Sequence, residues 1–157
     1  MILAIDPGPT HSALVVYDPR NRSVVQYGKP LNHHLAKHVR EWSTLAKHAD
    51  VMAIEMIASY GMPVGAEVFN TCVWIGRLIE SWSGLYELVY RREVKLHLCG
   101  SARAKDGNVR HALIDAFGGK DAIGTKKRPG PLHGIKADCW AALGVAITFA
   151  DRQEQVA

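Results

Sequence analysis

Three carboxylic acids border apolar segments of the sequence, where a charged group needs a partner. Asp6 follows the apolar residues 2–5, Glu55 ends the apolar run 51–54, and Asp138 begins the apolar stretch that closes the chain. An unpaired carboxylate next to a buried segment is costly unless it meets a cation or keeps its proton. If the acids converge, their hard oxygen ligands suit Mg²⁺ or Mn²⁺, which can polarise a phosphodiester and generate hydroxide for in-line attack.

Each of these acids also has an ordinary structural explanation. Asp6 can cap the Pro7-Gly8 turn, Glu55 can be an exposed strand end, and Asp138 can be the N-cap of a helix. For one acid alone these explanations are as good as a metal site. Only the combination of the three favours metal chemistry.

The segments that must position the acids predict an α/β domain. Short apolar runs bounded by turn residues predict strands at 2–5, 12–17, 23–27 and 51–54, of which the first three are antiparallel, and alternation predicts another at 94–98. Residues 85–90 fit either a helix extension or a strand. Helical periodicity predicts helices at 31–49, 66–82, 108–117 and 138–150, and a basic loop at 120–134. On the second helix we expect the buried residues Phe69, Val73, Ile75 and Leu78.

This element order predicts a mixed five-stranded sheet flanked by helices. In such a sheet the first and fourth strands are commonly parallel neighbours, which would bring Asp6 and Glu55 to the same edge.

Composition predicts a single domain spanning residues 1–157, with 151–157 as a frayed tail. The chain has 157 residues with 48% hydrophobic and 22% charged residues and a net charge of +4, which excludes a disordered chain. The first apolar run lacks a basic leader and is too short to span a bilayer, so we expect no membrane segment and a cytoplasmic location. Three widely spaced cysteines fit reduced thiols. No Gly-x-x-x-x-Gly-Lys loop indicates a nucleotide cofactor.

The ordered motifs resemble those of RuvC-type Holliday junction resolvases, most closely their bacteriophage-associated branch. The resemblance rests on residues 2–8 (ILAIDPG), 54–55 (IE), 96–98 (LHL) with 105–113 after them, and 137–146 (ADCWAALGVA), and it extends over nearly the whole chain. It implies a ribonuclease H-like fold, a homodimer, and Mg²⁺-dependent paired nicking of four-way branched DNA, with Mn²⁺ able to replace Mg²⁺. It fits a phage or a bacterial source equally.

The resemblance assigns the metal ligands to Asp6, Glu55 and Asp138. It departs from the family's pattern at Ala141, where better-known bacterial members have a second acid on the last helix. Either three carboxylates suffice or another group fills the space. Our catalytic candidates for that place are Lys136 and His133, just before the helix.

Further residues are candidates for DNA contacts and for the dimer interface. Basic side chains can neutralise phosphates, although such charges are also common on solvated surfaces. The resemblance places the loop after Glu55 at the open centre of the junction, where stacking or wedging is expected of its large side chains. The DNA-binding candidates are Tyr60, Met62, Arg103, Lys105, Arg110, Lys126, Lys127 and Arg128. The dimer candidates are Phe69, Trp74, Arg77 and Leu78, for which intramolecular packing is an equal alternative.

The sequence therefore predicts a structure-selective DNA endonuclease. One alternative is a related ribonuclease H-like nuclease that acts on structured RNA, since the acids are common to both. Another is a catalytically weak junction-binding protein, which the absent fourth acid favours.

Overall fold

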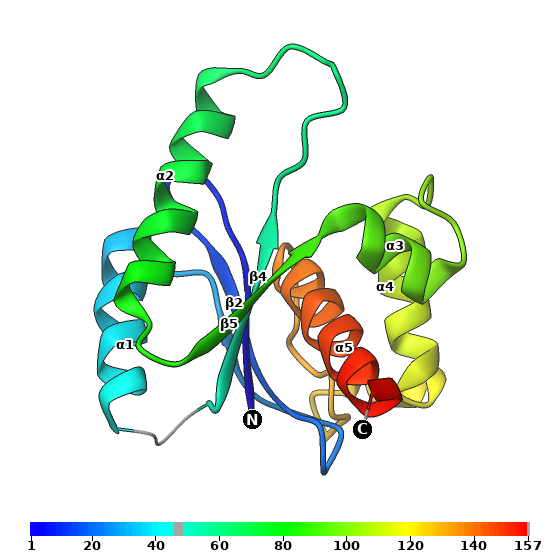
Figure 1. Ribbon diagram of the computed structural model, residues 1–157. Coiled ribbons are helices and arrows are strands. Elements are labelled where there is room, and N and C mark those ends of the chain that lie inside the picture. Colours follow the sequence, from blue (N-terminus) through cyan, green and yellow to red (C-terminus); the bar gives the residue numbers. More distant parts are fainter. Residues whose placement is uncertain (46–48, 157) are drawn as a thin grey trace.

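A computed structural model of the chain describes residues 1–45 and 49–156 and shows one five-stranded mixed sheet between two layers of helices (Figure 1). The strands are β1 (Ile2–Asp6), β2 (Ala13–Asp18), β3 (Ser23–Gly28), β4 (Val51–Met56) and β5 (Leu85–Tyr90), in the order β3-β2-β1-β4-β5. β1, β2 and β3 pair antiparallel, whereas β4 is parallel to β1 and to β5. The predicted mixed sheet and the neighbouring first and fourth strands are confirmed.

Helices cover both faces of the sheet. α1 (Asn32–Leu45) and α2 (Ala66–Ser81) lie on one face, and α3 (Arg91–Cys99), α4 (Asp106–Ala116) and α5 (Cys139–Val156) lie on the other (Figure 1). No helix within the described ranges combines the length and the apolarity that a membrane crossing requires. α1 covers residues 32–45 of the helix predicted at 31–49, and residues 46–48 of that prediction lie outside the described residues.

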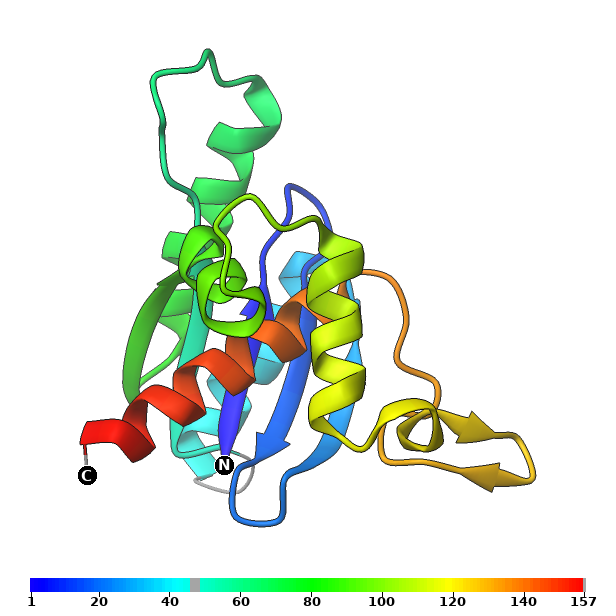
Figure 2. The same cartoon turned by 90° about the vertical axis from the view of Figure 1, so that its right-hand side faces the viewer.

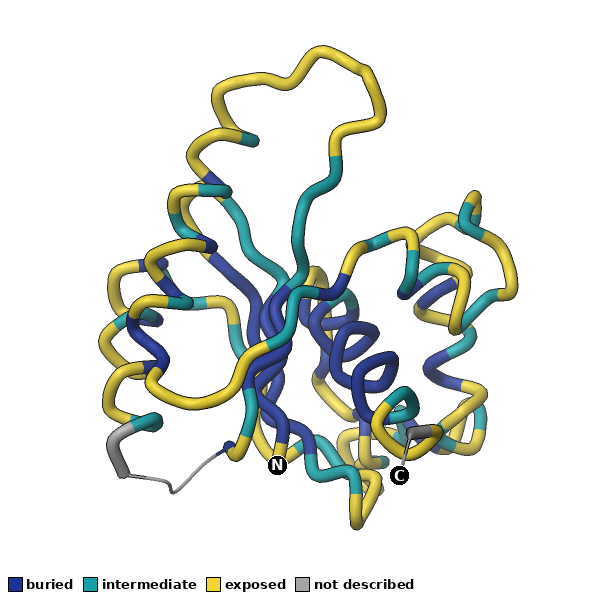
Figure 3. The backbone as a smooth tube through the Cα atoms, in the orientation of Figure 1, coloured by how far each residue is buried: buried dark blue, intermediate teal, exposed yellow. Residues whose placement is uncertain are grey.

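Strand periodicity divides the core into two clusters, one on each face of the sheet. Leu3 and Ile5 of β1 pack toward α1 and α2, whereas Ala4 packs toward α5. Successive side chains of a strand point to opposite faces, so the short apolar runs of the sequence are strands buried on both sides. The buried segments in Figure 3 are accordingly concentrated in the central strands and α5.

The predicted strand at 94–98 is wrong, because these residues belong to α3 and the edge strand is β5. Val94 is buried, Leu98 packs against the same cluster, and Leu96 between them is exposed. The first and last apolar residues are four positions apart, which is one helical turn. A five-residue alternation therefore matched a helix as well as a strand.

The predicted buried face of α2 is correct only in its second half. Ile75 and Leu78 are buried, whereas Phe69 and Val73 are 62% and 55% exposed. The start of α2 and the preceding loop extend beyond the ends of the strands (Figures 1 and 3), and residues 59–67 are all exposed. Helical periodicity identified an apolar stripe but could not tell how far the sheet reaches beneath it.

The predicted basic loop at 120–134 contains the 3₁₀ helix η1 (Gly119–Ala122) and a small hairpin of β6 (Gly124–Thr125) and β7 (Arg128–Pro129). The hairpin projects from the body of the protein (Figure 2). The chain then returns to α5, which continues to Val156 through the residues that we expected to fray. His97 Nε2 lies 2.7 Å from an Asp151 carboxylate oxygen, which fixes this end of α5 to α3. Ala157 lies outside the described residues.

A buried hydrogen-bond network holds the turn that follows Asp6. The Gly8 amide donates to Ser12 Oγ at 3.2 Å, and Ser12 Oγ donates to Asn32 Oδ1 at 2.6 Å. The side-chain amide of Asn32 donates to the Gly8 carbonyl oxygen at 2.8 Å. Because Ser12 and Asn32 are almost completely buried, neither water nor another conformation can easily replace these bonds. The start of α1 thereby fixes the turn beside Asp6.

Replacing Ser12 with alanine is expected to lower the free energy of unfolding by about 2 kcal/mol, because it leaves buried donors and acceptors of Gly8 and Asn32 unpaired. Urea denaturation followed by circular dichroism measures the change. The matched control is Ser83→Ala at an exposed serine, which should be near neutral. Equal stability of the two variants would contradict the role given to the network.

Candidate active site

The strand register brings Asp6 and Glu55 to one edge of the sheet. Ile5 pairs with Ile54 in the parallel β1–β4 ladder, so the next residues along each strand are neighbours. Ala4 and Ala53 pack in the cluster on the α5 side, and residues two positions later face the same way. Asp138 immediately precedes α5 on that side. The structure thus places all of the predicted acids at the edge where β1, β4 and α5 meet.

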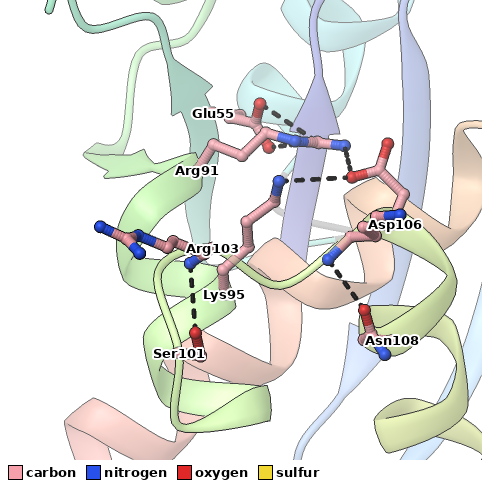
Figure 4. A network of polar contacts seen from close by, with 8 residues as sticks. Glu55, Arg91, Lys95, Ser101, Arg103, Asp106 and Asn108 are labelled. Atoms are coloured by element: carbon pink, nitrogen blue, oxygen red, sulfur yellow. Dashed lines mark hydrogen bonds and ion pairs between the residues drawn. The ribbon is translucent and has the colours of Figure 1, made fainter.

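Arg91 reaches the same place from β5. Val89 packs on the α5 side of β5, and Arg91 follows two residues later at the start of α3. Its guanidinium Nη1 lies 3.0 Å from Glu55 Oε2, and its Nη2 lies 2.9 Å from Asp106 Oδ1 (Figure 4). Lys95 Nζ is 3.7 Å from the same Asp106 oxygen. An arginine is well suited to such bridging because its donors form a rigid fork.

Lys29 pairs with Asp138, the acid on the other side of Asp6. It follows β3, and its ammonium group donates a hydrogen bond to a carboxylate oxygen of Asp138. Among the described residues, no side chain donates a hydrogen bond to Asp6 or forms an ion pair with it. The outer acids of the site are thus neutralised by cations, whereas Asp6 between them is not.

Burial and like charges raise the pKa of Asp6. Desolvation is the largest cause, the charge of Glu55 adds to it, Arg91 opposes it, and Asp138 raises the pKa further, to about 7 from an ordinary value of 3.8. Burial also raises the pKa of Glu55, against the opposing charge of Arg91 and its hydrogen bond. Acids whose ionised form is disfavoured in this way gain from a nearby cation.

Asp6 and Asp138 line a cavity of about 160 Å³ between β1, α3, α4 and α5, whereas Glu55 pairs with Arg91 in its wall. Ala141 forms part of its wall, so the place of the absent fourth acid faces the cavity and is apolar. The charged lining residues are Asp6, Asp138, Asp106, Arg91 and Lys95.

The structure does not bring Lys136 or His133 to this cavity. Both are exposed and neither lines it. The ring of His133 is directed toward the loop instead, with Nδ1 3.1 Å from the Ile123 carbonyl oxygen. Proximity in sequence to Asp138 misled the prediction, because the chain from the hairpin approaches α5 from outside the sheet (Figure 2).

Sequence reasoning missed the cations Arg91, Lys95 and Lys29 and the acid Asp106. With 85–90 undecided between helix and strand, Arg91 could not be placed at a strand end. Lys29 follows the predicted hairpin strand and carries no motif. The available signal was positional, because Arg91 follows an apolar run just as Glu55 ends one.

The DNA-binding candidates fall into separate regions. Tyr60 and Arg103 line a groove of about 820 Å³ together with Glu55 and Arg91. Met62, on the loop that overhangs this edge of the sheet, is exposed. Lys105 is the N-cap residue of α4, and the Arg110 guanidinium lies over the Trp140 ring, 5.1 Å from its centre.

The hairpin residues Lys126, Lys127 and Arg128 are not beside the acids. Their hairpin follows the far end of α4, whose first residue is Asp106, and an eleven-residue helix is about 16 Å long. None of the three hairpin residues lines either of the cavities that contain Asp6 and Asp138.

The dimer candidates are split between core and surface. Leu78 is fully buried within its own chain, so the packing alternative holds for it and the predicted contact with a partner is wrong. Phe69 is exposed. The Arg77 guanidinium lies over the Trp74 ring, 4.9 Å from its centre, and both residues line a groove between α2 and α1.

The donor chemistry fits a hard divalent cation, although the acids are not yet arranged around one. Within residues 1–45 and 49–156, no three His, Cys, Asp or Glu side chains are grouped closely enough to hold a metal ion as they stand. Glu55 is turned to Arg91 and Asp138 to Lys29. The desolvated carboxyl of Asp6, flanked by further carboxylates, is nevertheless the oxygen-rich surrounding that Mg²⁺ and Mn²⁺ require.

Comparison with known proteins identifies the fold. No family model matches the chain, and no curated protein matches it by sequence. The Thermus thermophilus RuvC structure aligns over 98% of this chain and 95% of its own, with a TM-score of 0.70 and 17% identity. T. thermophilus RuvC in complex with Holliday junction substrate aligns over 98% and 94%, with a TM-score of 0.66 and 16% identity.

The fowlpox virus Holliday junction resolvase aligns over 96% of this chain and 98% of its own, with a TM-score of 0.51 and 13% identity. The chain therefore has the ribonuclease H-like fold of RuvC, and the sequence resemblance is confirmed at the level of the fold.

Replacing Asp6 with asparagine is expected to stabilise the metal-free protein at neutral and alkaline pH. The pKa of Asp6 is raised from 3.8 in the unfolded chain to about 7 in the folded protein, so folding favours the protonated acid. The stability that the protonated Asp6 contributes is fully present below pH 3.8, the pKa in the unfolded chain, and is lost as the pH rises through about 7. The variant has no charge to desolvate, and its advantage should grow between pH 4 and 7 to on the order of 4 kcal/mol.

Urea denaturation in EDTA across pH 4.5–9 measures this difference. Asp115→Asn, at an exposed acid of α4, should show no such trend. An Asp6→Asn protein no more stable than wild type at pH 8 would contradict the burial of an uncompensated carboxylate.

Proposed function

We propose that this protein is a DNA endonuclease that resolves four-way junctions by metal-dependent phosphodiester hydrolysis. The observation that carries the proposal is the convergence of Asp6, Glu55 and Asp138 at the meeting point of β1, β4 and α5. This arrangement occurs on a fold shared with RuvC over 98% of the chain. A solved structure contains T. thermophilus RuvC in complex with Holliday junction substrate, and the same class of substrate is our proposal here.

The three carboxylates would hold the divalent metal, Mg²⁺ or Mn²⁺. Such a metal supplies an activated water and stabilises charge on the phosphate oxygens. To bind it, Asp6 must lose its proton and Glu55 must turn from Arg91. The carboxylates thus make metal binding pH-dependent, because protonation removes the ligands.

Arg91 and Lys95 are placed to receive the phosphate. Both line the cavity with Asp6 and Asp138, and each can bind phosphate oxygens when its acid partner engages elsewhere. An arginine fork matches two phosphate oxygens, whereas a lysine acts as a point charge. These residues would orient the scissile phosphate over Asp6.

The junction centre would lie over the groove of Glu55, Tyr60 and Arg103. Tyr60 and Met62 are 62% and 72% exposed on the overhanging loop, although exposed large apolar side chains are usually costly to solubility. Base stacking on Tyr60 and insertion of Met62 next to an unstacked base would use these side chains. This loop would sense the open centre that distinguishes a junction from linear duplex.

The hairpin carrying Lys126, Lys127 and Arg128 would contact a duplex arm outside the active site. Its projection from the body (Figure 2) puts positive charge beyond the reach of the scissile phosphate. Phosphate contacts of this kind position DNA without reading its sequence.

A homodimer would place two such sites on two strands of one junction. The exposed Phe69 of α2, with Trp74 and Arg77 in the groove between α2 and α1, forms the surface that we propose for the contact. A two-fold interface relates equal patches on both subunits, which matches paired nicking of a symmetric junction.

A second candidate is a junction-binding protein of weak catalytic power. Ala141 in the cavity wall and the cations that neutralise Glu55 and Asp138 favour it. Tight junction binding without nicking in either Mg²⁺ or Mn²⁺ would identify this function. An RNA nuclease would instead cut a structured RNA faster than a DNA junction.

Asp6→Asn is expected to lower cleavage of a synthetic four-way DNA junction by about a hundredfold or more, because the metal loses its central ligand. Gel analysis of end-labelled junction measures it, beside a linear duplex and a branched RNA of matched sequence. Asp115→Asn should cut like wild type. The proposal fails if duplex and junction are cut alike, or if the Asp6 variant cuts undiminished.

Removing the positive charges of the hairpin in Lys126→Ala/Lys127→Ala is expected to weaken junction binding and to make it less dependent on salt. Two lost phosphate contacts lower the slope of log affinity against log salt by about 1.8. The cleavage rate at saturating protein should be unchanged, because the hairpin lies away from the acids. Fluorescence anisotropy at several salt concentrations measures the slope, with Lys37→Ala on α1 as control. An unchanged slope would exclude the hairpin from the interface.

A further inference from the structure

Arg91 lies at the boundary between two hollows of the site. With Lys95 it lines the cavity of Asp6 and Asp138, and the same two cations line the groove of about 820 Å³ in which Glu55 lies. The charge of Glu55 raises the pKa of Asp6 and the charge of Arg91 lowers it, so both groups act on that acid. Arg91 is therefore the link between Glu55 and the acids with which it would share a metal.

The metal-free protein turns Glu55 away from a metal and toward Arg91. Nη1 of Arg91 donates to both carboxylate oxygens of Glu55, at 3.0 Å to Oε2 and 3.3 Å to Oε1. The glutamate side chain is only 12% exposed, and hydrogen bonds between charged groups are about twice as strong as neutral ones. A metal bound at Asp6 must therefore compete with a guanidinium for the oxygens of Glu55.

Asp106 gives Arg91 a second anchor. Nη2 of Arg91 lies 2.9 Å from Oδ1 of Asp106, the first residue of α4 (Figure 4). Arg91 can therefore break its bonds with Glu55 and still remain at the cavity. The freed Nη1 can then donate to a phosphate oxygen, which a guanidinium binds as readily as it binds a carboxylate. Lys95 Nζ, 3.7 Å from the same Asp106 oxygen, forms no ion pair with Glu55 within the described residues.

We propose that Arg91, anchored on Asp106, couples metal binding to phosphate binding: it withholds Glu55 from the metal in the DNA-free protein and releases it to the metal when a DNA phosphate takes its place. The inference rests on the proposed function, because it concerns the same metal and the same phosphate. Each of the two ligands draws one partner out of the Arg91–Glu55 pair, so each strengthens the binding of the other to an equal extent. Asp106 is a positioning residue, since it acts only through Arg91.

The Mn²⁺ affinity of the DNA-free protein tests the hold on Glu55. It is measured by electron paramagnetic resonance of free Mn²⁺ at pH 8, above the pKa of Asp6. Arg91→Met is expected to bind Mn²⁺ about tenfold more tightly than Lys95→Met, because only the first variant frees Glu55 from a charged hydrogen-bond partner. Both variants remove one positive charge from the same cavity wall, so the difference between them reports on Glu55 and not on the charge.

Replacing Asp106 tests the anchor. Asp106→Ala is expected to bind Mn²⁺ about threefold more weakly than wild type, because Arg91 then has no second acid to hold when Glu55 turns away. In the Arg91→Met background the same change should leave the affinity unaltered, since the residue through which Asp106 acts is gone. Asp106 is 73% exposed, so this variant decides the matter even if Arg91→Met does not fold.

The coupling to phosphate is measured on a four-way DNA junction at saturating protein. In wild type, half-maximal single-turnover cleavage is expected at about tenfold less Mn²⁺ than half-maximal binding without DNA, a coupling of ordinary size. The ratio between these two Mn²⁺ concentrations should be about tenfold smaller in Arg91→Met, in which Glu55 is already free. Lys95→Met should keep the wild-type ratio.

Equal Mn²⁺ affinities of Arg91→Met and Lys95→Met, an unchanged affinity of Asp106→Ala, or a wild-type ratio in Arg91→Met would each overturn the proposal. A wild type that cuts no junction would overturn the proposed function alone. The junction then stays intact, and the coupling is measured as the gain in junction affinity on adding Mn²⁺. Junction-selective cleavage with equal affinities of the two charge-matched variants would overturn only the role of Arg91.

Discussion

The burial of a carboxylate beside two others, at the end of the central strand, is the constraint on which the site depends. Desolvation is the largest cause of the raised pKa of Asp6, about 7, and the charges of Glu55 and Asp138 add to it. Arg91 and Lys29 lower the cost of this burial from opposite sides. The hydrogen bonds between Ser12 and the α1 start keep the turn after Asp6 from moving away to relieve it. Stability is thus given up locally, which is common where a site must receive a cation.

The strands make this cluster possible through their two-residue period. Each of β1, β4 and β5 buries a small or branched residue against α5 and presents a polar side chain two positions later. Asp6 and Glu55 lie side by side because their strands are parallel and in register, whereas Arg91 follows by two positions the β5 residue that pairs with Glu55. An acid at the end of an apolar run is readable in a sequence, and so is the mixed sheet. The positions of the acids could therefore be predicted before the structure was known.

The partners of the acids could not be predicted, because they depend on how elements meet. Arg91 becomes significant only when residues 85–90 are a strand, and Lys29 only when β3 ends beside α5. Lys136 and His133 were predicted to be near the site because they are close to Asp138 in sequence. In the structure they lie away from the cavity, because the chain approaches α5 from the hairpin. Phe69 and Val73 fit the helical periodicity of α2, but they are exposed because this part of the helix extends beyond the sheet. The local sequence pattern predicts a helix, whereas the size of the sheet beneath it determines which helix residues are buried.

The long helix α5 gives the site a closed mechanical frame. Its first turn adjoins Asp138, and its far end is held to α3, where His97 contacts Asp151 and Glu93 pairs with Arg152. α3 in turn begins at Arg91, within the site itself. Asp138, α5, the ion pairs at its far end, α3 and Arg91 therefore form a continuous series of contacts. The packing of α3 on α5, with these contacts at their far ends, therefore joins the two helices that begin at Arg91 and beside Asp138.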